Sequence, residues 1–425
     1  MGIVFLTLLS VPDQCVGRIY IDINAPSIPK FNIAIPDFKN LNENKEHPKL
    51  AEQFAEVISN DLYLSGYFNP IDKKAFLEEK DSPLTTEGIN FKDWSVIGAE
   101  LLLKGGYTCV GGRVEVVVRL FDVYWGRQIL GRRALGDLSQ YRHLIHRLSN
   151  EIIRRLTGQD GIFLTKLAFV GNATGNKEIY VSDYDGHNVR QITSDKSIAL
   201  LPSWSRDGTK LVYNSYKDGG PMLYMKDMAS GAVRRISGRS GLNIGASWAP
   251  DGKELALTLS ENGNSDIFTI NLEGKILRHL VSHWALDVSP TFSPDGKKIA
   301  FVSNRSGSPQ IYTLDSTNER KERITFEGNY NTSPAWSSLN RIAYSSLEQG
   351  TLDIYTMGLE GGNLKRLTEN QGNNESPCWS PDGRYIVFSS NREGRYHLYL
   401  MNANGGNQTR ITSLKGDQTS PSWAP

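Results

Sequence analysis

The chain has 425 residues, enough for two or three domains that each bury a hydrophobic core. Its 47 basic and 46 acidic residues balance, which argues against nucleic acid as the main partner. The 40 glycines and 18 tyrosines, together with few long apolar helical patterns, favour a mostly β architecture.

Residues 1–17 are predicted to be a truncated signal-like segment. The apolar run from Ile3 to Val11 is too short to span a bilayer and looks like the core of a secretory signal without its basic start. A buried first strand is the alternative. The residues around Cys15 make a poor lipoprotein cleavage site, so no lipid is expected there. The segment therefore predicts an exported protein.

Residues 18–30 are predicted to be a flexible tail. Three isoleucines alternate along it, at Ile19, Ile21 and Ile23, before two prolines interrupt the pattern. An apolar, β-prone tail on an exported protein is suited to adding a strand to a partner.

Residues 31–158 predict a compact α/β domain. Apolar residues recur at helical spacing in two stretches and at strand spacing in three. A glycine pair marks a tight turn between two of the strands, and a glycine stops the second helix. The expected elements are a strand over 30–38, a helix over 47–68, strands over 95–109 and 112–123 joined at Gly111-Gly112, and a helix over 138–158 ending at Gly158.

An internal repeat dominates residues 162–425. An S-P-x-W motif, or a variant of it, recurs every 43 or 44 residues, and each copy reads as four short strands with a P-D-G turn after the first. The second strands are nearly continuous apolar runs, as expected for strands covered on both faces. Units of this kind predict a β-propeller. The six motif aromatics are Trp204, Trp248, Phe292, Trp336, Trp379 and Trp423.

The strand count predicts how the ring closes. Six copies of an I-Y strand begin with Ile179, yet no S-P-x-W precedes the first of them. The missing strand is the "SPSWAP" of residues 420–425, which should pair beside Leu167 to Val170 and remove an open sheet edge. The predicted fold is an α/β N-terminal domain followed by an all-β six-bladed β-propeller that the C-terminal strand closes.

The repeated residues are interpreted as structural. The tryptophans should pack between blades, and one aspartate per D-G turn does not supply the converging oxygens that calcium needs. No metal or cofactor is therefore expected. Cys378 occupies a small-residue position of the repeat, and a disulfide with Cys109 would have to join different domains. The turn aspartates are Asp207, Asp251, Asp295 and Asp382.

No catalytic motif is present. The chain has no G-x-S-x-G, no P-loop, no H-E-x-x-H and no dinucleotide fingerprint. His143 and His146 share one helix face, but no carboxylate or cysteine lies near them in the sequence. We therefore expect a protein that is not an enzyme.

The order of parts, from signal-like segment through apolar tail and α/β domain to a six-bladed propeller with a solitary closing strand, resembles the TolB family. These are periplasmic components of the Tol-Pal cell-envelope system of Gram-negative bacteria. The resemblance covers the whole chain. Repeats such as "SPDGKKIAF" are shared with other propellers, so the N-terminal domain and the closing strand make it specific, while the short signal departs from the family pattern. It implies a role in outer-membrane invagination at cell division and in envelope integrity.

The resemblance also implies two binding surfaces. The lipoprotein Pal would bind one mouth of the propeller, where family contacts align with Leu242, Gly245 and Val288. TolA would bind the N-terminal tail, which packs back on the protein when Pal is bound. Further mouth candidates, for which ordinary polar loop residues are the alternative, are Asn243, Asp287, Asn331, Asn374, Glu375, Arg305 and Arg392. The tail candidates are Arg18, Ile19, Tyr20, Ile21, Asp22 and Ile23.

Two other functions stay open. A secreted carbohydrate-binding propeller would need exposed aromatic residues on the mouth loops, for which Trp284 and Tyr330 are the candidates. A gating propeller would need a hydrolase on a separate chain. The chain itself is expected to be a monomer that works at the outer membrane without inserting into it and does not bind nucleic acid.

Overall fold

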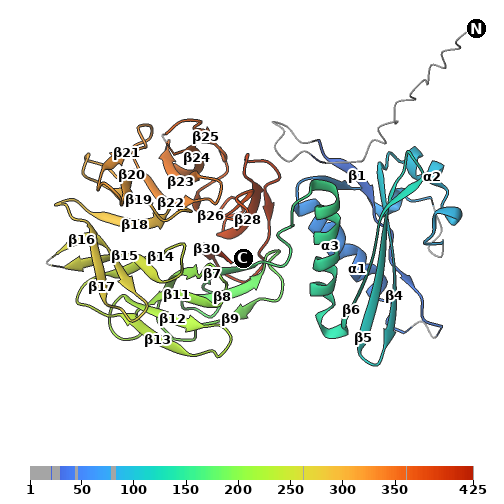
Figure 1. Ribbon diagram of the computed structural model, residues 1–425, viewed down its shortest axis with the longest axis horizontal. Helices are drawn as coiled ribbons and strands as arrows, with labels where there is room; N and C mark the ends of the chain where they lie inside the picture. Colours follow the sequence, from blue (N-terminus) through green and yellow to red (C-terminus); the bar gives the residue numbers. More distant parts are fainter. Residues whose placement is uncertain are drawn as a thin grey trace, which may run out of the picture. The chain divides into compact units, whose positions relative to one another are not determined.

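A computed structural model describes residues 21, 29–43, 46–77, 83–261, 263–359 and 361–424 (Figure 1). The signal-like segment 1–17 and most of the tail lie outside the described residues. Among the helices that are described, none combines the length and the apolar character that a membrane crossing needs. The chain divides into two compact units: one is Met1–Glu56, Tyr67–Leu144 and Asn150–Asp160, and the other is Val57–Gly66, Ile145–Ser149 and Gly161–Pro425.

The first unit is built on one mixed sheet, ordered β3-β1-β4-β5-β6, with β2 paired to β4. The two glycines between β4 and β5 have φ of 57° and 78°, values that favour glycine, as the tight turn requires. The strands are β1 (Phe31–Ala34), β2 (Lys39–Asn40), β3 (Phe68–Pro70), β4 (Leu101–Val110), β5 (Arg113–Asp122) and β6 (Arg127–Asp137). The helices in this part of the chain are α1 (Leu50–Leu64), α2 (Phe91–Val96) and α3 (Tyr141–Thr157), with 3₁₀ turns at Lys73–Ala75, Thr86–Gly88 and Leu138–Gln140. Residues 57–64 of α1 and 145–149 of α3 belong to the second unit.

The strand expected over 30–38 ends at Ala34 as β1, and a second short strand, β2, begins beyond it at Lys39; the two pair with different points along β4. Ile33 of β1 pairs with Leu101, whereas Lys39 of β2 pairs with Gly106. Pro36 lies between them and has no N–H to donate to a ladder, which explains the interruption. Gly105 is needed on β4 because a side chain there would collide with the ring of Phe38.

The two long helices form where the apolar spacing predicts them. Phe54 of α1 contacts Tyr107 of β4 and Tyr141 of α3, with ring centroids 5.3 and 5.6 Å apart. α3 ends at Gly158, which has φ of 74° and donates its N–H to the carbonyl of Arg154. This confirms the glycine stop that the sequence predicts.

An 11-residue strand at the edge of the first sheet, β6, is not predicted by the sequence pattern. It pairs antiparallel with β5 along its whole length, from Arg127 opposite Asp122 to Asp137 opposite Arg113. Arg132 and Arg133 are exposed near its middle, and charged residues of this kind are common on edge strands, where they discourage pairing with other chains. These charges break the apolar alternation by which a strand is recognised.

In the described part of the second unit, six four-stranded antiparallel sheets form the blades of a propeller. The middle of each second strand is fully buried, as at Leu211, Ile299 and Ile386. This confirms the interpretation that both faces of these strands are covered. From the innermost strand outward, the first blade is β30 (Gln418–Ala424), β7 (Lys166–Gly171), β8 (Glu178–Asp183) and β9 (Arg190–Gln191), and the second is β10 (Ala199–Trp204), β11 (Lys210–Ser215), β12 (Met222–Asp227) and β13 (Val233–Ser237). The third blade is β14 (Asn243–Trp248), β15 (Glu254–Glu261), β16 (Asn264–Asn271) and β17 (Ile276–Val281), and the fourth is β18 (Asp287–Phe292), β19 (Lys298–Ser303), β20 (Gln310–Asp315) and β21 (Lys321–Arg323). The fifth blade is β22 (Asn331–Trp336), β23 (Arg341–Glu348), β24 (Thr351–Gly358) and β25 (Lys365–Arg366), and the sixth is β26 (Asn374–Trp379), β27 (Tyr385–Ser390), β28 (His397–Asn402) and β29 (Thr409–Arg410).

The C-terminal strand closes the ring as the repeat predicts. β30 pairs antiparallel with β7, with Trp423 opposite Leu167 and Thr419 opposite Val170. One blade therefore contains strands that lie about 250 residues apart in the sequence.

Two of the motif tryptophans form hydrogen bonds to the neighbouring blade. The indole N–H of Trp248 donates to the carbonyl of Ser203, and that of Trp379 donates to the carbonyl of Ala335, each at 3.1 Å. Each acceptor belongs to the inner strand of the preceding blade. The tryptophans therefore have the packing role that the sequence predicts.

The D-G turns after the inner strands are held by their aspartates. Asp207 accepts hydrogen bonds from the hydroxyl of Ser205 at 2.6 Å and from the backbone N–H of Thr209 at 3.0 Å. These bonds, that from Ser205 first, lower the pKa of Asp207 to about 2. Gly208 follows with φ of 67°. Asp295 and Asp382 accept the same pair of bonds in their blades, which supports their interpretation as turn formers.

Candidate partner-binding site

One face of the propeller, its mouth, is formed by two sets of loops. The leading loops precede the inner strands, and each lies beside the loop that joins the second and third strands of its blade. The carbonyl of Leu242 in a leading loop accepts from the N–H of Ser260, and the carbonyl of Asn373 accepts from the N–H of Asn391, both at 3.1 Å. The two sets of loops therefore share one face, as the strand order predicts.

All six inner strands carry the same bulge just below the mouth. The register with the second strand shifts between the second and fifth residues, as between Ile244 and Ser247. A bulge bends the strand and changes the direction of its side chains. The third residue of every inner strand has a positive φ between 51° and 67°, and these residues are Leu201, Gly245, Ser289, Ser333, Ser376 and Ser420.

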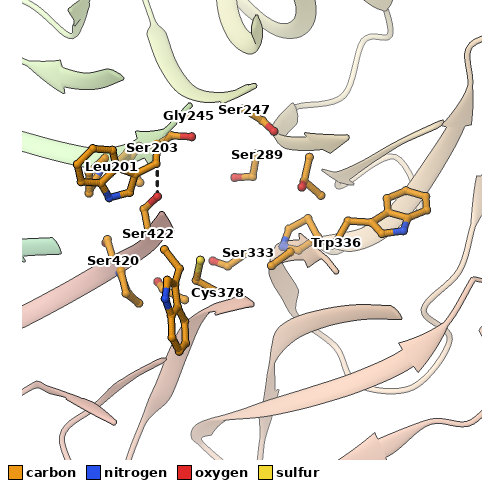
Figure 2. A pocket seen from close by; sticks show the side chains of 18 of the residues that line it. Leu201, Ser203, Gly245, Ser247, Ser289, Ser333, Trp336, Cys378, Ser420 and Ser422 are labelled. Carbon is orange, nitrogen blue, oxygen red and sulfur yellow. Dashed lines mark hydrogen bonds between the residues drawn. The ribbon is translucent and has the colours of Figure 1, made fainter. Parts of the chain in front are cut away.

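The bulged residues line a central cavity of about 670 Å³ (Figure 2). Small side chains from the fifth position of the strands, including Ser203, Ser247 and Ser422, line it as well. The dashed line in Figure 2 marks the bond that the backbone N–H of Trp204 donates to the hydroxyl of Ser422 at 3.1 Å, between neighbouring blades. This cavity, called the channel below, is lined by serines, threonines and prolines together with four tryptophans and several aliphatic side chains.

Cys378 also lines the channel but is poorly suited to nucleophilic chemistry. Loss of solvation raises the pKa of its thiol to about 11, so the thiolate is scarce at neutral pH. Burial also raises the pKa of the Cys109 thiol. Cys109 and Cys378, the cysteines that the structure describes, are both free thiols.

Four predicted mouth residues, Asn243, Asp287, Asn331 and Asn374, occupy the first position of their inner strands and are fully buried. Asn243 accepts hydrogen bonds from the hydroxyl of Ser237 and from the N–H of Arg239, and it donates to the carbonyl of Arg239. These side chains therefore lie beneath the leading loops and hold them in place. They do not form the exposed rim on which the sequence analysis placed them, because the loops fold back over them.

The two predicted arginines contact side chains at these same buried positions. The guanidinium of Arg305 lies 2.8 Å from a carboxylate oxygen of Asp287 and stacks over the ring of Tyr312, with its central carbon 5.0 Å from the ring centroid. Arg392 donates to the side-chain oxygen of Asn374 at 2.8 Å and stacks over Tyr399. Both arginines therefore have their polar and aromatic partners within their own blades, and the sequence alone could not reveal these contacts.

The other four predicted mouth residues, Leu242, Gly245, Val288 and Glu375, are partly exposed at the mouth. Glu375 lines a smaller cavity of about 300 Å³ together with Tyr396 and Asp417. Burial, followed by the charge and hydrogen bond of Glu375, raises the pKa of Tyr396. These four residues are available to a partner in the structure as it stands.

Large apolar side chains are exposed on the leading loops of three blades. Trp284 and Phe326 are 78 % and 73 % exposed, and Ile198, Leu286 and Tyr330 are between 41 % and 50 % exposed. Trp284 and Tyr330 are predicted from the sequence, whereas the other three are not. Their positions in the repeat could have identified them. Each lies directly before, or a few residues before, the first residue of an inner strand, and that first residue is buried.

The predicted tail site is described at one residue. Ile21 is 2 % exposed, and its N–H donates to the carbonyl of Leu156 in the last turn of α3 at 2.7 Å. That carbonyl is one of those that a helix end leaves without an internal partner. The other tail candidates, Arg18, Ile19, Tyr20, Asp22 and Ile23, lie outside the described residues.

A buried polar cluster in the second unit has the composition of a metal site. Ligand atoms of Asp61, His146 and Asp185 lie within 4.8 Å of one another. The carboxylate of Asp61 also receives hydrogen bonds from His146 at 2.9 Å, from Ser149 at 2.5 Å and from Tyr184 at 2.6 Å. Three such contacts satisfy a buried carboxylate without an ion. No companion for His146 is recognisable in the sequence because Asp61 lies 85 residues before it.

Comparison with known proteins gives a consistent result over most of the chain. The family model for the TolB beta propeller domain matches residues 153–344 and 338–425, and that for the TolB amino-terminal domain matches residues 19–129. The crystal structure of TolB from Acinetobacter baumannii is similar, with a TM-score of 0.80 and 27% sequence identity over 96% of this chain and 100% of that chain.

Curated relatives match over a shorter region. The Tol-Pal system protein TolB of Desulfosudis oleivorans is 42% identical over 198 residues, which are 46% of this chain and 45% of that protein. The Tol-Pal system protein TolB of Syntrophotalea carbinolica is 41% identical over 166 residues, 39% of each chain. The aligned regions therefore span less than half the length of these relatives.

Proposed function

This chain belongs to the TolB family, and from that premise we propose that it is a non-enzymatic periplasmic component of the Tol-Pal system. In this proposal it binds the lipoprotein Pal at the mouth of the propeller and TolA through the N-terminal tail. It thereby supports outer-membrane invagination at cell division and the integrity of the envelope.

The observation that carries the Pal proposal is the architecture of the mouth. Buried hydrogen bonds hold the leading loops, as at Asn243, so a partner meets a surface that is already ordered. Binding to an ordered surface costs less conformational entropy than binding to a loose one. Leu242, Gly245 and Val288, with which the family contacts align, are all partly exposed there.

The TolA proposal rests on the composition of the tail and on the position of Ile21. Its side chain is buried, and its backbone pairs with the end of α3. A tail that docks on its own protein at this point must be released before TolA can bind the same residues. Pal and TolA would then be coupled, and each partner would change the affinity of the other by the same factor.

Isothermal titration calorimetry with the soluble domain of Pal from the same organism tests the main proposal. We expect Pal to bind the mature chain one to one. A variant that lacks residues 16–30 should still bind Pal one to one, but with a changed affinity, and it should lose binding to the C-terminal domain of TolA. If the deletion leaves the affinity for Pal unchanged, the two sites are independent. Absence of Pal binding to the full mature chain would contradict the proposal.

A carbohydrate-binding function is the second candidate because Trp284 is 78 % exposed on the mouth. Exposed indole rings are the usual platforms on which sugar rings stack. Retention of peptidoglycan fragments by the chain, lost on Trp284→Ala, together with no affinity for Pal, would favour this candidate over the first.

A further inference from the structure

The buried polar cluster around Asp61 joins three segments of the second unit. Asp61 belongs to the part of α1 that this unit includes, and His146 belongs to the part of α3 that it includes. Asp185 lies in the turn that follows β8 of the first blade. The side chains of Asp61, His146 and Asp185 are 0 %, 3 % and 0 % exposed. Water therefore does not solvate the charges of this cluster.

The contacts of Asp61 identify it as an ionised carboxylate. Nδ1 of His146 lies 2.9 Å from it, and the hydroxyls of Ser149 and Tyr184 donate to it at 2.5 and 2.6 Å. An ionised carboxylate only accepts hydrogen bonds, whereas a protonated one would also need an acceptor for its own hydrogen. The three donors therefore fit the charged form, and Nδ1 of His146 carries a hydrogen.

A second carboxylate, that of Asp185, lies beside the same imidazole ring. Oxygens of Asp61 and Asp185 and a ring nitrogen of His146 are all within 4.8 Å of one another. Asp185 also accepts a hydrogen bond from the backbone N–H of His187 at 3.2 Å and lies 3.3 Å from Nδ1 of that residue. The side chain of His187 is 57 % exposed. Carboxylates and imidazoles therefore alternate from the buried Asp61 out to the solvent.

This arrangement favours a proton on His146. With a neutral imidazole, two buried carboxylates would lie close together, and like charges out of water are costly. An imidazolium between them removes one unit of negative charge and can donate from both ring nitrogens. The other titratable groups in contact with the cluster are Tyr184 and His187. Arg142 lies one turn before His146 in α3 and adds a positive charge that does not change with pH.

The same segment of α1 is also attached to the sixth blade, by bonds between neutral groups. The hydroxyl of Tyr385 donates to the carbonyl of Ser65 at 2.9 Å, and the amide of Asn407 donates to the carbonyl of Tyr63 at 3.1 Å. Neither donor titrates below about pH 10. The segment therefore has one attachment that depends on a proton and one that does not, and the two can be tested separately.

We propose that Asp61, His146 and Asp185 form a proton-dependent latch, which fastens the α1 and α3 segments to the first blade while His146 is an imidazolium. Loss of this proton leaves two buried negative charges and loosens the contact. A free histidine loses its proton near pH 6.5, whereas the latch retains it to higher pH. Above about pH 6.5 the folded chain then binds one proton more than the unfolded chain, so its stability falls as the pH rises. The inference does not depend on the proposals for Pal and TolA.

Urea unfolding of the full chain between about pH 6 and pH 9, followed by tryptophan fluorescence, tests the latch. One extra bound proton makes the unfolding equilibrium constant of the wild type rise by up to about tenfold per pH unit above about pH 6.5. His146→Asn keeps a donor near the position of Nδ1 but cannot hold a proton, so it should be less stable at pH 6 and should lose this rise. Asp185→Asn removes the second carboxylate and should also lose it.

Tyr385→Phe is the matched control, because it removes a neutral bond from the same segment of α1. It should lower stability by a similar amount at every pH and keep the slope of the wild type. A wild type with the slope of His146→Asn would overturn the inference. So would a control that loses the slope as His146→Asn does.

A second measurement needs only the wild type. In nitrogen NMR spectra of the chain labelled with ¹⁵N-histidine, one of the seven histidines should keep the shifts of an imidazolium at about pH 7.5, one unit above the midpoint of a free histidine. Seven neutral histidines at that pH would contradict the latch. A divalent metal that the purified wild type retains and Asp61→Asn loses would also contradict it, because a metal would then join the two carboxylates in place of the proton.

Discussion

The two ends of the six inner strands follow different rules. At the far end every strand has an aromatic residue, tryptophan in five copies and Phe292 in the sixth. At the mouth the residues range from leucine through asparagine to glutamate. The far end packs between blades, so each copy meets the same requirement, whereas the mouth faces solvent and is free to vary. A symmetric scaffold can therefore carry an asymmetric binding surface.

Removing the closing strand should destabilise the propeller more than any single substitution at either end of the inner strands. A variant without residues 420–425 loses Trp423 and most of its ladder with β7. The loss should approach the whole stability of a domain, about 5–15 kcal/mol, because every blade depends on ring closure. Urea unfolding followed by tryptophan fluorescence measures the effect. Inserting the sequence QTSPSWAPDG ahead of Lys166 in the same variant should restore folding, and a truncated chain that unfolds like the wild type would contradict the closure.

A pair of substitutions on one strand compares the two ends directly. Trp379→Ala should cost about 3–5 kcal/mol, since the indole is buried and bonded to the preceding blade. Glu375→Ala, four residues earlier at the mouth, should change stability by less than about 1 kcal/mol. Equal losses in urea unfolding would show that the two ends do not differ as proposed.

A substitution of Arg305 tests whether the buried first residues of the inner strands stabilise the fold. Arg305→Ala should cost about 3 kcal/mol, because it leaves the fully buried carboxylate of Asp287 without its ion partner. Adding Asp287→Asn should recover part of the loss, since asparagine occupies the equivalent position in three other blades. Chemical unfolding of both variants provides the measurement. A loss of Pal affinity at full stability would instead place Arg305 in the interface.

Leu201→Gly should act in the opposite direction on stability. Glycine adopts a φ of 52° without strain, so the variant should gain roughly 1 kcal/mol. Its affinity for Pal should fall, because an exposed leucine at the mouth is lost. A melting curve and a Pal titration on one sample measure both effects. A destabilised variant would show that the packing of Leu201 outweighs its strain.

The smallest effect on stability is expected at Asp207, in the turn that follows the tryptophan end of an inner strand. The pKa of Asp207 is lowered to about 2, so its hydrogen bonds stabilise the folded state above pH 4 and are lost as the pH falls through 2. Asp207→Asn should therefore melt slightly below the wild type at pH 7. The difference should shrink between pH 4 and pH 2. A gap that stays constant over this range would exclude the carboxylate as its cause.

The repeat made the propeller predictable, including the number of blades and the closing strand. Period and turn chemistry specify such a fold locally, because each copy meets the same neighbours. β6 was missed because an edge strand tolerates charges such as Arg132 and Arg133 that interrupt its alternation. The break at Pro36 was visible in the sequence but was not used.

The sequence predicted which loops form the mouth, but it predicted only some of the side chains that are exposed there. Strand order indicates which loops share a face, and the sequence alone therefore determined where a partner would meet the propeller. Polar residues such as Asn243 and Asp287 looked like rim contacts, yet the tertiary structure buries them under the loops that they hold. Burial and bulge geometry depend on contacts between distant segments, so only the folded chain decides which side chains face the solvent.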